Sequence, residues 1–172
     1  MKNYPVKQIF IVFLAFFLTA CGFQINRNRI VLPYNAQSLS LNQIENKSFI
    51  PRLDIHLRND LTLELSDNGI NQVSPAQADL LMNVEVLSSK HDRSTYSLND
   101  QQIYKFTFKT EGVLTVEDQR NDKRFIENQS LIGEYQFESK NSDLSQKETT
   151  DGRRKSIEDL AQKIANQLTR NF

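Results

Sequence analysis

Few residue types in this 172-residue chain are suited to covalent or metal chemistry. The chain has one cysteine, Cys21, and two histidines, His56 and His91. A single cysteine cannot form an intramolecular disulfide, and these three residues are too few for a structural zinc cluster of Cys and His ligands. The sequence also contains no Gly-rich phosphate loop and no G-x-G-x-x-G motif. We therefore expect neither a metal nor a cofactor.

Cys21 is the residue with the best-defined chemistry. The segment Leu18-Thr19-Ala20-Cys21 follows the bacterial lipobox pattern, in which an apolar residue and two small residues precede a cysteine. Cleavage between Ala20 and Cys21 would leave an N-palmitoyl, S-diacylglycerol cysteine at the new terminus. Each buried methylene contributes ~0.8 kcal/mol, so two or three acyl chains anchor a protein stably. The alternative is a signal peptide that happens to end near an ordinary cysteine.

The residues before Cys21 have the composition of a secretory signal peptide. Lys2 and Lys7 form a basic start, and Ile9 to Leu18 is an uninterrupted run of ten apolar residues. A transmembrane helix needs roughly 20 apolar residues, so this run is too short to favour a permanent span. We predict that residues 1–20 are a lipoprotein signal peptide.

The mature chain is predicted to consist of a tether and one domain. Gly22 occupies the place where Asp would retain a lipoprotein in the inner membrane, which favours the outer membrane. Residues 21–36 are polar and are predicted to form a lipidated tether. Residues 37–172 are predicted to form a single domain on the periplasmic side. The whole chain has 21 basic and 21 acidic side chains, so nothing draws it to nucleic acid.

The two histidines and the paired acids do not have the pattern of an active site. His56 is expected between the core leucines of a helix, and His91 in a turn rich in Ser, Asp and Arg. No G-x-S-x-G elbow presents a nucleophile. The paired acids Glu117-Asp118 and Glu158-Asp159 fall where turns and helix surfaces carry solvated charge.

Two segments have the period of an amphipathic helix. Leucines at every fourth position predict a helix over 51–66, with Ser48 as a possible cap, Ile55 and Leu63 beside the leucine face, and Asn68-Gly69 as the left-handed ending. A polar stretch, 138–152, is expected to be a loop or a helix entry outside the core. The last helix follows it, with an apolar stripe of Ile157, Leu160, Ile164 and Leu168.

Alternating residues predict the strands. The segments 78–88, 104–116 and 125–137 each place apolar side chains at every second position, and 38–43 is a shorter candidate. This order predicts an α+β fold, a two-layer sandwich in which two helices pack on one face of a roughly four-stranded, mostly antiparallel sheet. The other face would carry polar side chains and face water or dock a partner: Lys105, Thr107, Lys109, Asn83, Glu85, Ile126, Asn128 and Ser130.

Several of these features occur together in one family. Cys21-Gly22-Phe23 followed by Arg27, the helix closed by Asn68-Gly69, the strand with Tyr104 and the terminal amphipathic helix resemble the LPS-assembly lipoproteins of the LptE type. The resemblance implies an outer-membrane lipoprotein that binds and plugs a large β-barrel translocon and assists lipopolysaccharide transport to the outer leaflet. It implies no catalysed reaction.

The resemblance also implies lipopolysaccharide contacts from basic residues in the loops between elements. Lys147 and Lys140 fall in the loop before the last helix, with Lys147 the preferred candidate. The loop after the first long strand, 97–100, lacks the basic residue that the family often has there, and Arg93 is the nearest. Solvated loop lysines are the alternative for Lys140 and Lys147. A periplasm-facing, lipid-anchored adaptor or envelope-stress binding protein is the alternative function.

Overall fold

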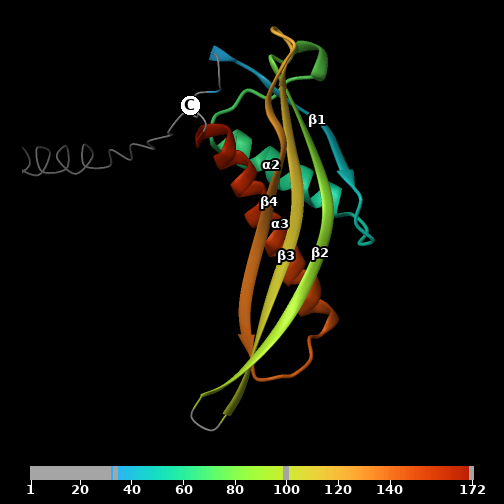
Figure 1. Ribbon diagram of the computed structural model, residues 1–172, viewed down its shortest axis with the longest axis vertical. Coiled ribbons are helices and arrows are strands. Elements are labelled where there is room, and N and C mark those ends of the chain that lie inside the picture. Colours follow the sequence, from blue (N-terminus) through green and yellow to red (C-terminus); the bar gives the residue numbers. More distant parts are fainter. Residues whose placement is uncertain (1–31, 33–34, 99–100, 171–172) are drawn as a thin grey trace, which may run out of the picture.

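The computed structural model describes residues 32, 35–98 and 101–170, and every structural statement below concerns that part of the chain. The predicted signal peptide, Cys21 and most of the predicted tether lie outside it. In order along the chain the elements are β1 (Leu39–Asn46), α2 (Leu53–Asp67), the 3-10 turn η2 (Pro75–Gln77), β2 (Leu80–Leu98), β3 (Gln101–Asp118), β4 (Lys123–Ser139) and α3 (Gln146–Arg170). Both helices lie on one side of the four-stranded sheet (Figure 1), which confirms the predicted α+β fold.

The sheet has the order β1-β2-β3-β4. β2, β3 and β4 form an antiparallel meander, whereas β1 pairs with β2 in parallel because α2 returns the chain between them. β2 continues to Leu98, ten residues beyond the predicted strand 78–88, and its 19 residues span roughly 60 Å. The alternation of apolar and polar residues stops before the strand does, because a register shift lies between Val86 and Ser88.

Helix α2 agrees closely with its prediction. Its four leucines, at 53, 57, 61 and 65, are buried, and Asn68-Gly69 follows its last residue as expected, with a positive φ at Gly69 (74°). The Gly69 N–H donates to the Ser66 carbonyl and the Ile70 N–H to the Leu65 carbonyl, which satisfies the last turn. Two expectations were wrong. Ile55 and Leu63 are 52% and 62% exposed, and the residue before the helix is Arg52, without a side-chain cap.

Helix α3 begins at Gln146, so the stretch 138–152 is not a loop throughout. The Ser145 Oγ accepts the Glu148 N–H at 3.2 Å, and the Glu148 carboxylate accepts the Ser145 N–H at 2.8 Å. The Ser145 hydroxyl also donates to the Glu148 carboxylate at 2.6 Å, and this bond, followed by the one from the Ser145 N–H, lowers the pKa of Glu148. Together these bonds form a capping box, the S-x-x-E pattern that starts a helix. Gly152, expected at the end of a loop, is buried in α3, where an added Cβ would lie 2.5 Å from the Phe108 ring.

A bulge in β4 changes which of its side chains face the helices. Val116 pairs with Ile126, but Leu114 pairs with Gln129, and Asn128 between them has a φ of 49°. The extra residue reverses the alternation. Ile126, expected on the uncovered face, is 4% exposed and belongs to the core, whereas beyond the bulge the odd-numbered residues face inward as predicted.

Candidate functional site

The candidate residues and the segment that follows Cys21 lie at opposite ends of the sheet. We call the end where β1 and β2 begin and β3 turns into β4 the anchor end, because residues 35–38 enter the fold there. We call the other end, where β4 leads into α3, the distal end. Figure 1 shows these ends at the top and bottom of the sheet.

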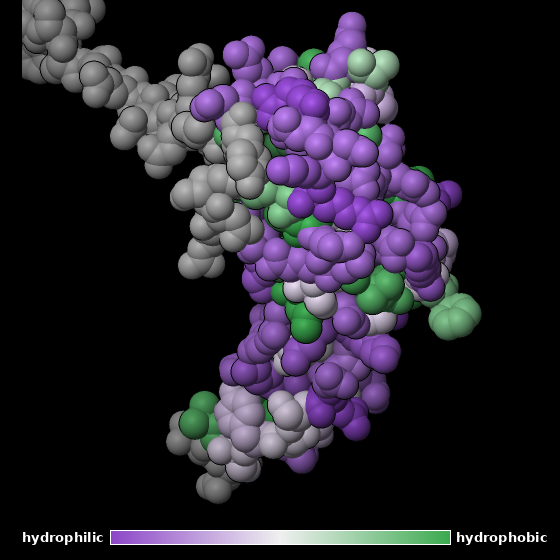
Figure 2. Space-filling view, turned by 45° about the horizontal axis from the view of Figure 1, so that its top comes forward, coloured by the Kyte–Doolittle hydropathy of each residue, from purple (hydrophilic) through white to green (hydrophobic). Residues whose placement is uncertain are grey.

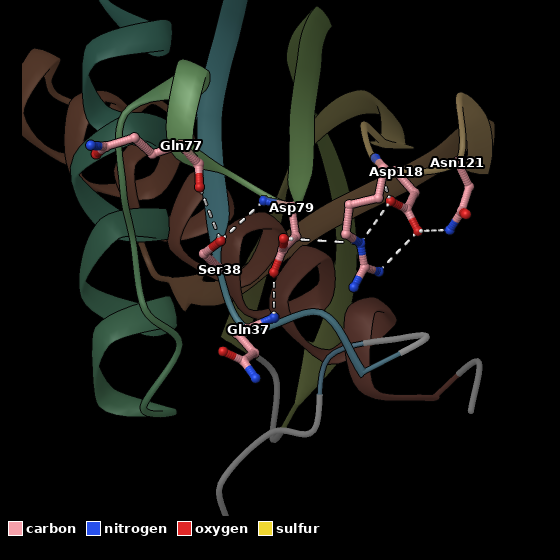
Figure 3. Close-up of polar contacts among 7 residues, drawn as sticks. Gln37, Ser38, Gln77, Asp79, Asp118 and Asn121 are labelled. Carbon is pink, nitrogen blue, oxygen red and sulfur yellow. Dashed lines mark hydrogen bonds and ion pairs between the residues drawn. The ribbon is translucent and has the colours of Figure 1, made fainter.

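The anchor end is held by polar contacts to the segment that precedes β1 (Figure 3). The Gln37 N–H donates to Asp79 Oδ2 at 2.7 Å, and the Asp79 N–H donates to Ser38 Oγ at 3.0 Å. The Leu80 N–H donates to the Ser38 carbonyl at 3.1 Å. These bonds fix the position at which the chain from Cys21 joins the sheet.

Asp118 ties the turn between β3 and β4 into the same end. Its carboxylate accepts the Arg120 N–H at 2.9 Å, the Arg120 Nη2 at 3.0 Å and the Asn121 Nδ2 at 3.0 Å. The bonds from Arg120 are the largest influence lowering the pKa of Asp118 to about 2. Arg120 also lies 3.9 Å from Asp79. The expectation that Asp118 is solvated was wrong, since its side chain is 2% exposed.

Arg93 lies at the distal end, on β2 rather than in the loop that follows it. Its Nη1 donates to the Ser142 carbonyl at 2.5 Å and lies 3.7 Å from the Asp143 carboxylate. Its guanidinium lies 5.7 Å from the centre of the Tyr104 ring. Arg93 therefore holds the loop between β4 and α3 against the sheet, a contact between residues 49 apart that no local pattern indicates.

The two lysine candidates flank that loop and are exposed. Lys140 follows the last residue of β4, so the structure brings it to the segment that Arg93 binds. Lys147 was expected in the loop but is the second residue of α3. From Leu80 to Arg93 the strand advances roughly 45 Å, so these three basic residues lie far from the anchor end.

The sheet face opposite the helices is mainly polar, as predicted apart from Ile126. Lys47 pairs with Glu85 at 2.6 Å, and Lys109 lies 3.9 Å from Glu134. Leu87 and Ile132 add exposed apolar side chains that the sequence analysis missed. Figure 2 likewise shows a largely hydrophilic surface with small apolar patches.

The two histidines lie on different elements of the fold. His56 lies on α2 between the buried residues Leu53 and Leu57, as expected, and its own side chain is exposed. His91 was expected in a turn but lies on β2, with its ring stacked on Phe108 at 5.2 Å. Within residues 32, 35–98 and 101–170, no three His, Cys, Asp or Glu side chains are arranged to hold a metal ion. No helix in these ranges is long and apolar enough to cross a membrane.

Comparison with known proteins identifies one family. The model of the lipopolysaccharide-assembly family LptE matches residues 36–172. No curated protein matches the chain in sequence. A minor lipoprotein from Acinetobacter baumannii is 15% identical, with a TM-score of 0.45 over 76% of this chain and 94% of that one. The rare lipoprotein B from Shewanella oneidensis is 16% identical, with a TM-score of 0.37 over 74% and 90%.

Proposed function

Because the chain belongs to the LptE lipopolysaccharide-assembly family, we propose that it is an outer-membrane lipoprotein that binds and plugs a large β-barrel translocon. In this role it assists the passage of lipopolysaccharide to the outer leaflet and catalyses no reaction. The observation that carries the proposal is the extent of the family match, 36–172, which includes every helix and strand of the fold. Lipidation of Cys21 supplies the membrane anchor.

The polar sheet face supports the plug role. A barrel lumen is lined by polar side chains, so a protein seated in it needs a polar surface. The face opposite the helices has such a surface, with Lys105, Thr107 and Lys109 along β3. An adaptor that remains in the periplasm would keep this face open to solvent.

Labelling in membranes tests the plug role. Ser94 is exposed and pairs with Lys105 on the polar face, so a Ser94→Cys variant places a thiol there. We expect a membrane-impermeant maleimide to label this thiol in the purified protein and at least tenfold more slowly in isolated outer membranes. Equal labelling in both preparations would contradict the plug role.

The distal end is the proposed lipopolysaccharide contact. Lysine ammonium groups make charge-assisted hydrogen bonds to phosphates, and Lys140 and Lys147 are exposed where Arg93 fixes the loop between them. Arg93 already binds Ser142, so we assign it the positioning of this loop and assign phosphate contact to the lysines. The alternative of solvated lysines predicts that their removal changes nothing.

Binding of lipopolysaccharide to the full-length protein in mild detergent distinguishes these alternatives. We expect the double variant Lys140→Ala, Lys147→Ala to bind at least tenfold more weakly, whereas Lys90→Ala, which removes an exposed lysine elsewhere on β2, binds normally. Arg93→Ala should weaken binding and also speed proteolysis within 140–145. Unchanged binding by the double variant would remove the lysines from the site.

A further inference from the structure

β4 is an edge strand of the sheet, and α3 covers only part of the side of β4 that pairs with no other strand. The Glu134 N–H donates to Asp159 Oδ2 at 2.7 Å, and Lys163 Nζ donates to the Ile132 carbonyl at 2.8 Å. Asp159 and Lys163 are themselves paired at 2.7 Å. This ion pair therefore bonds to main-chain groups that would otherwise accept another strand.

The edge is open nearer the distal end. Main-chain groups of alternate residues point to the same side of a strand, so Gln136 and Glu138 direct theirs outward as Ile132 and Glu134 do. In the described part of the chain, no hydrogen bond reaches the main-chain groups of Gln136 or Glu138 on this side. We call residues 136–138 the open edge.

A cavity of about 430 Å³ adjoins the open edge, between β4 and the first half of α3. Its apolar floor is formed by Tyr135 and Phe137, the neighbours of Gln136 that point inward. The Phe137 ring stacks on Phe106 at 5.6 Å and on Phe108 at 6.1 Å, which holds the floor in place. A strand added to the open edge would direct alternate side chains toward this cavity.

The charges around the cavity favour a basic ligand. Its remaining lining consists of Gly152 and the charged side chains Glu148, Asp151, Arg154, Lys155 and Glu158. Lys155 is occupied by Tyr135, since its Nζ lies 3.2 Å from the Tyr135 hydroxyl and 4.6 Å from the ring centre. On the opposite face of β4, Glu134 and Glu138 lie on either side of Gln136, and Lys109 lies 3.9 Å from Glu134.

The same acids exclude a second copy of this chain as the ligand. If two β4 strands paired antiparallel about Gln136, Glu134 of each copy would lie directly opposite Glu138 of the other. Like charges in that arrangement destabilise a strand pair. A basic side chain of an added segment would instead meet acids on whichever face it points to, those of the cavity on one face and Glu134 and Glu138 on the other.

We propose that the open edge of β4 docks an extended, basic segment of a protein partner, which adds as a strand and places one Arg or Lys side chain in the cavity. The main chain of Gln136 and Glu138 supplies hydrogen bonds, and the aromatic floor and acids of the cavity supply the preference for a cation. This inference goes beyond lipopolysaccharide transport and does not depend on it.

Synthetic peptides test the proposal with the full-length protein in mild detergent. The probe is a fluorescein-labelled peptide, Thr-Arg-Val-Arg-Val-Arg-Thr, followed by fluorescence anisotropy at increasing salt. We expect saturable binding, at least tenfold weaker binding of the peptide with Glu in place of Arg, and a similar loss when alternate peptide nitrogens are methylated. Bound peptide should slow hydrogen exchange at the Gln136 and Glu138 amides.

Two protein variants complete the test. Gln136→Pro removes one outward N–H of the open edge and should weaken binding at least tenfold, whereas Ser130→Pro, on the same edge beyond the α3 ion pair, should leave binding unchanged. Urea unfolding of both variants verifies that they are folded. Equal binding of the methylated and unmethylated peptides to the unmodified protein would overturn the proposal, because attraction between charges needs no main-chain hydrogen bonds.

Discussion

Replacing Gly133 with alanine should destabilise the contact between α3 and β4. An alanine Cβ at this position would lie 2.0 Å from the Ser156 carbonyl oxygen and 2.6 Å from the Leu160 main-chain nitrogen. Both atoms belong to the helix backbone, so the contact can be relieved only if α3 moves away from the sheet. Such a movement opens the core around Leu160, Ile164 and Leu168, which are all buried.

The expected loss of stability is about 3 kcal/mol, at the upper end of the usual overpacking cost. The gain from replacing a strand glycine with alanine, roughly 0.5–1 kcal/mol, offsets only part of the clash. With a urea slope of about 2 kcal/mol per M, the unfolding midpoint should fall by about 1.5 M. The assay is urea denaturation of the full-length protein in mild detergent, followed by circular dichroism.

Gly112→Ala is the matched control. Its Cβ would lie 3.1 Å from Leu160 Cδ2, the end of a flexible side chain, and 3.4 Å from the Glu85 carbonyl. The leucine can move, so we expect a change within about 1 kcal/mol. If Gly133→Ala unfolds at the same urea concentration as Gly112→Ala, close approach of the α3 backbone does not limit the packing of this fold.

The other predictions concern the anchor end, the start of α3 and the membrane anchor. Asp118→Asn should cost about 2 kcal/mol at pH 7, because the pKa of Asp118 in the folded protein, about 2, lies below its ordinary value of 3.8. The stabilisation is complete above the ordinary value and is lost as the pH falls through the folded value, so the difference in urea midpoint should shrink as the pH falls from about 4 to about 2. A constant difference would contradict this. Ser145→Ala should cost about 1 kcal/mol in the same assay, since it removes the capping box with Glu148, and no change would exclude that role. Cys21→Ser should release the protein from the membrane fraction on cell fractionation, and retention would refute lipid anchoring.

Much of the fold can be predicted because its hydrophobic periods are regular. The leucines of α2 keep one spacing over more than three turns, and Phe106, Phe108, Leu114 and Val116 keep one parity along β3. Ile126 could not be placed in this way, because the bulge at Asn128 reverses the parity and depends on the pairing with β3. The S-x-x-E pattern of residues 145–148 marks the start of α3 in the sequence, but the polar composition of this stretch left a loop or a helix entry open.

The candidate site is less accessible from sequence because its contacts join distant segments. Arg93 binds the main-chain carbonyl of Ser142, and Asp79 accepts the main-chain N–H of Gln37. Such main-chain groups do not depend on residue type, so the residues at 142 and 37 give no sign of these contacts. Asp118 is buried only because the turn after it folds Arg120 back onto the carboxylate. The sequence shows directly that Lys140 and Lys147 are charged. Their distance from the anchor end can be worked out only when the length of β2 is known.

The most direct test of the proposed role is purification of the tagged full-length protein from outer membranes in mild detergent. Co-eluting proteins are identified by mass spectrometry, and the eluate is then treated with protease. We expect a large β-barrel to co-elute and to shield this protein from digestion. A protein that elutes alone and is digested at once would contradict the plug role.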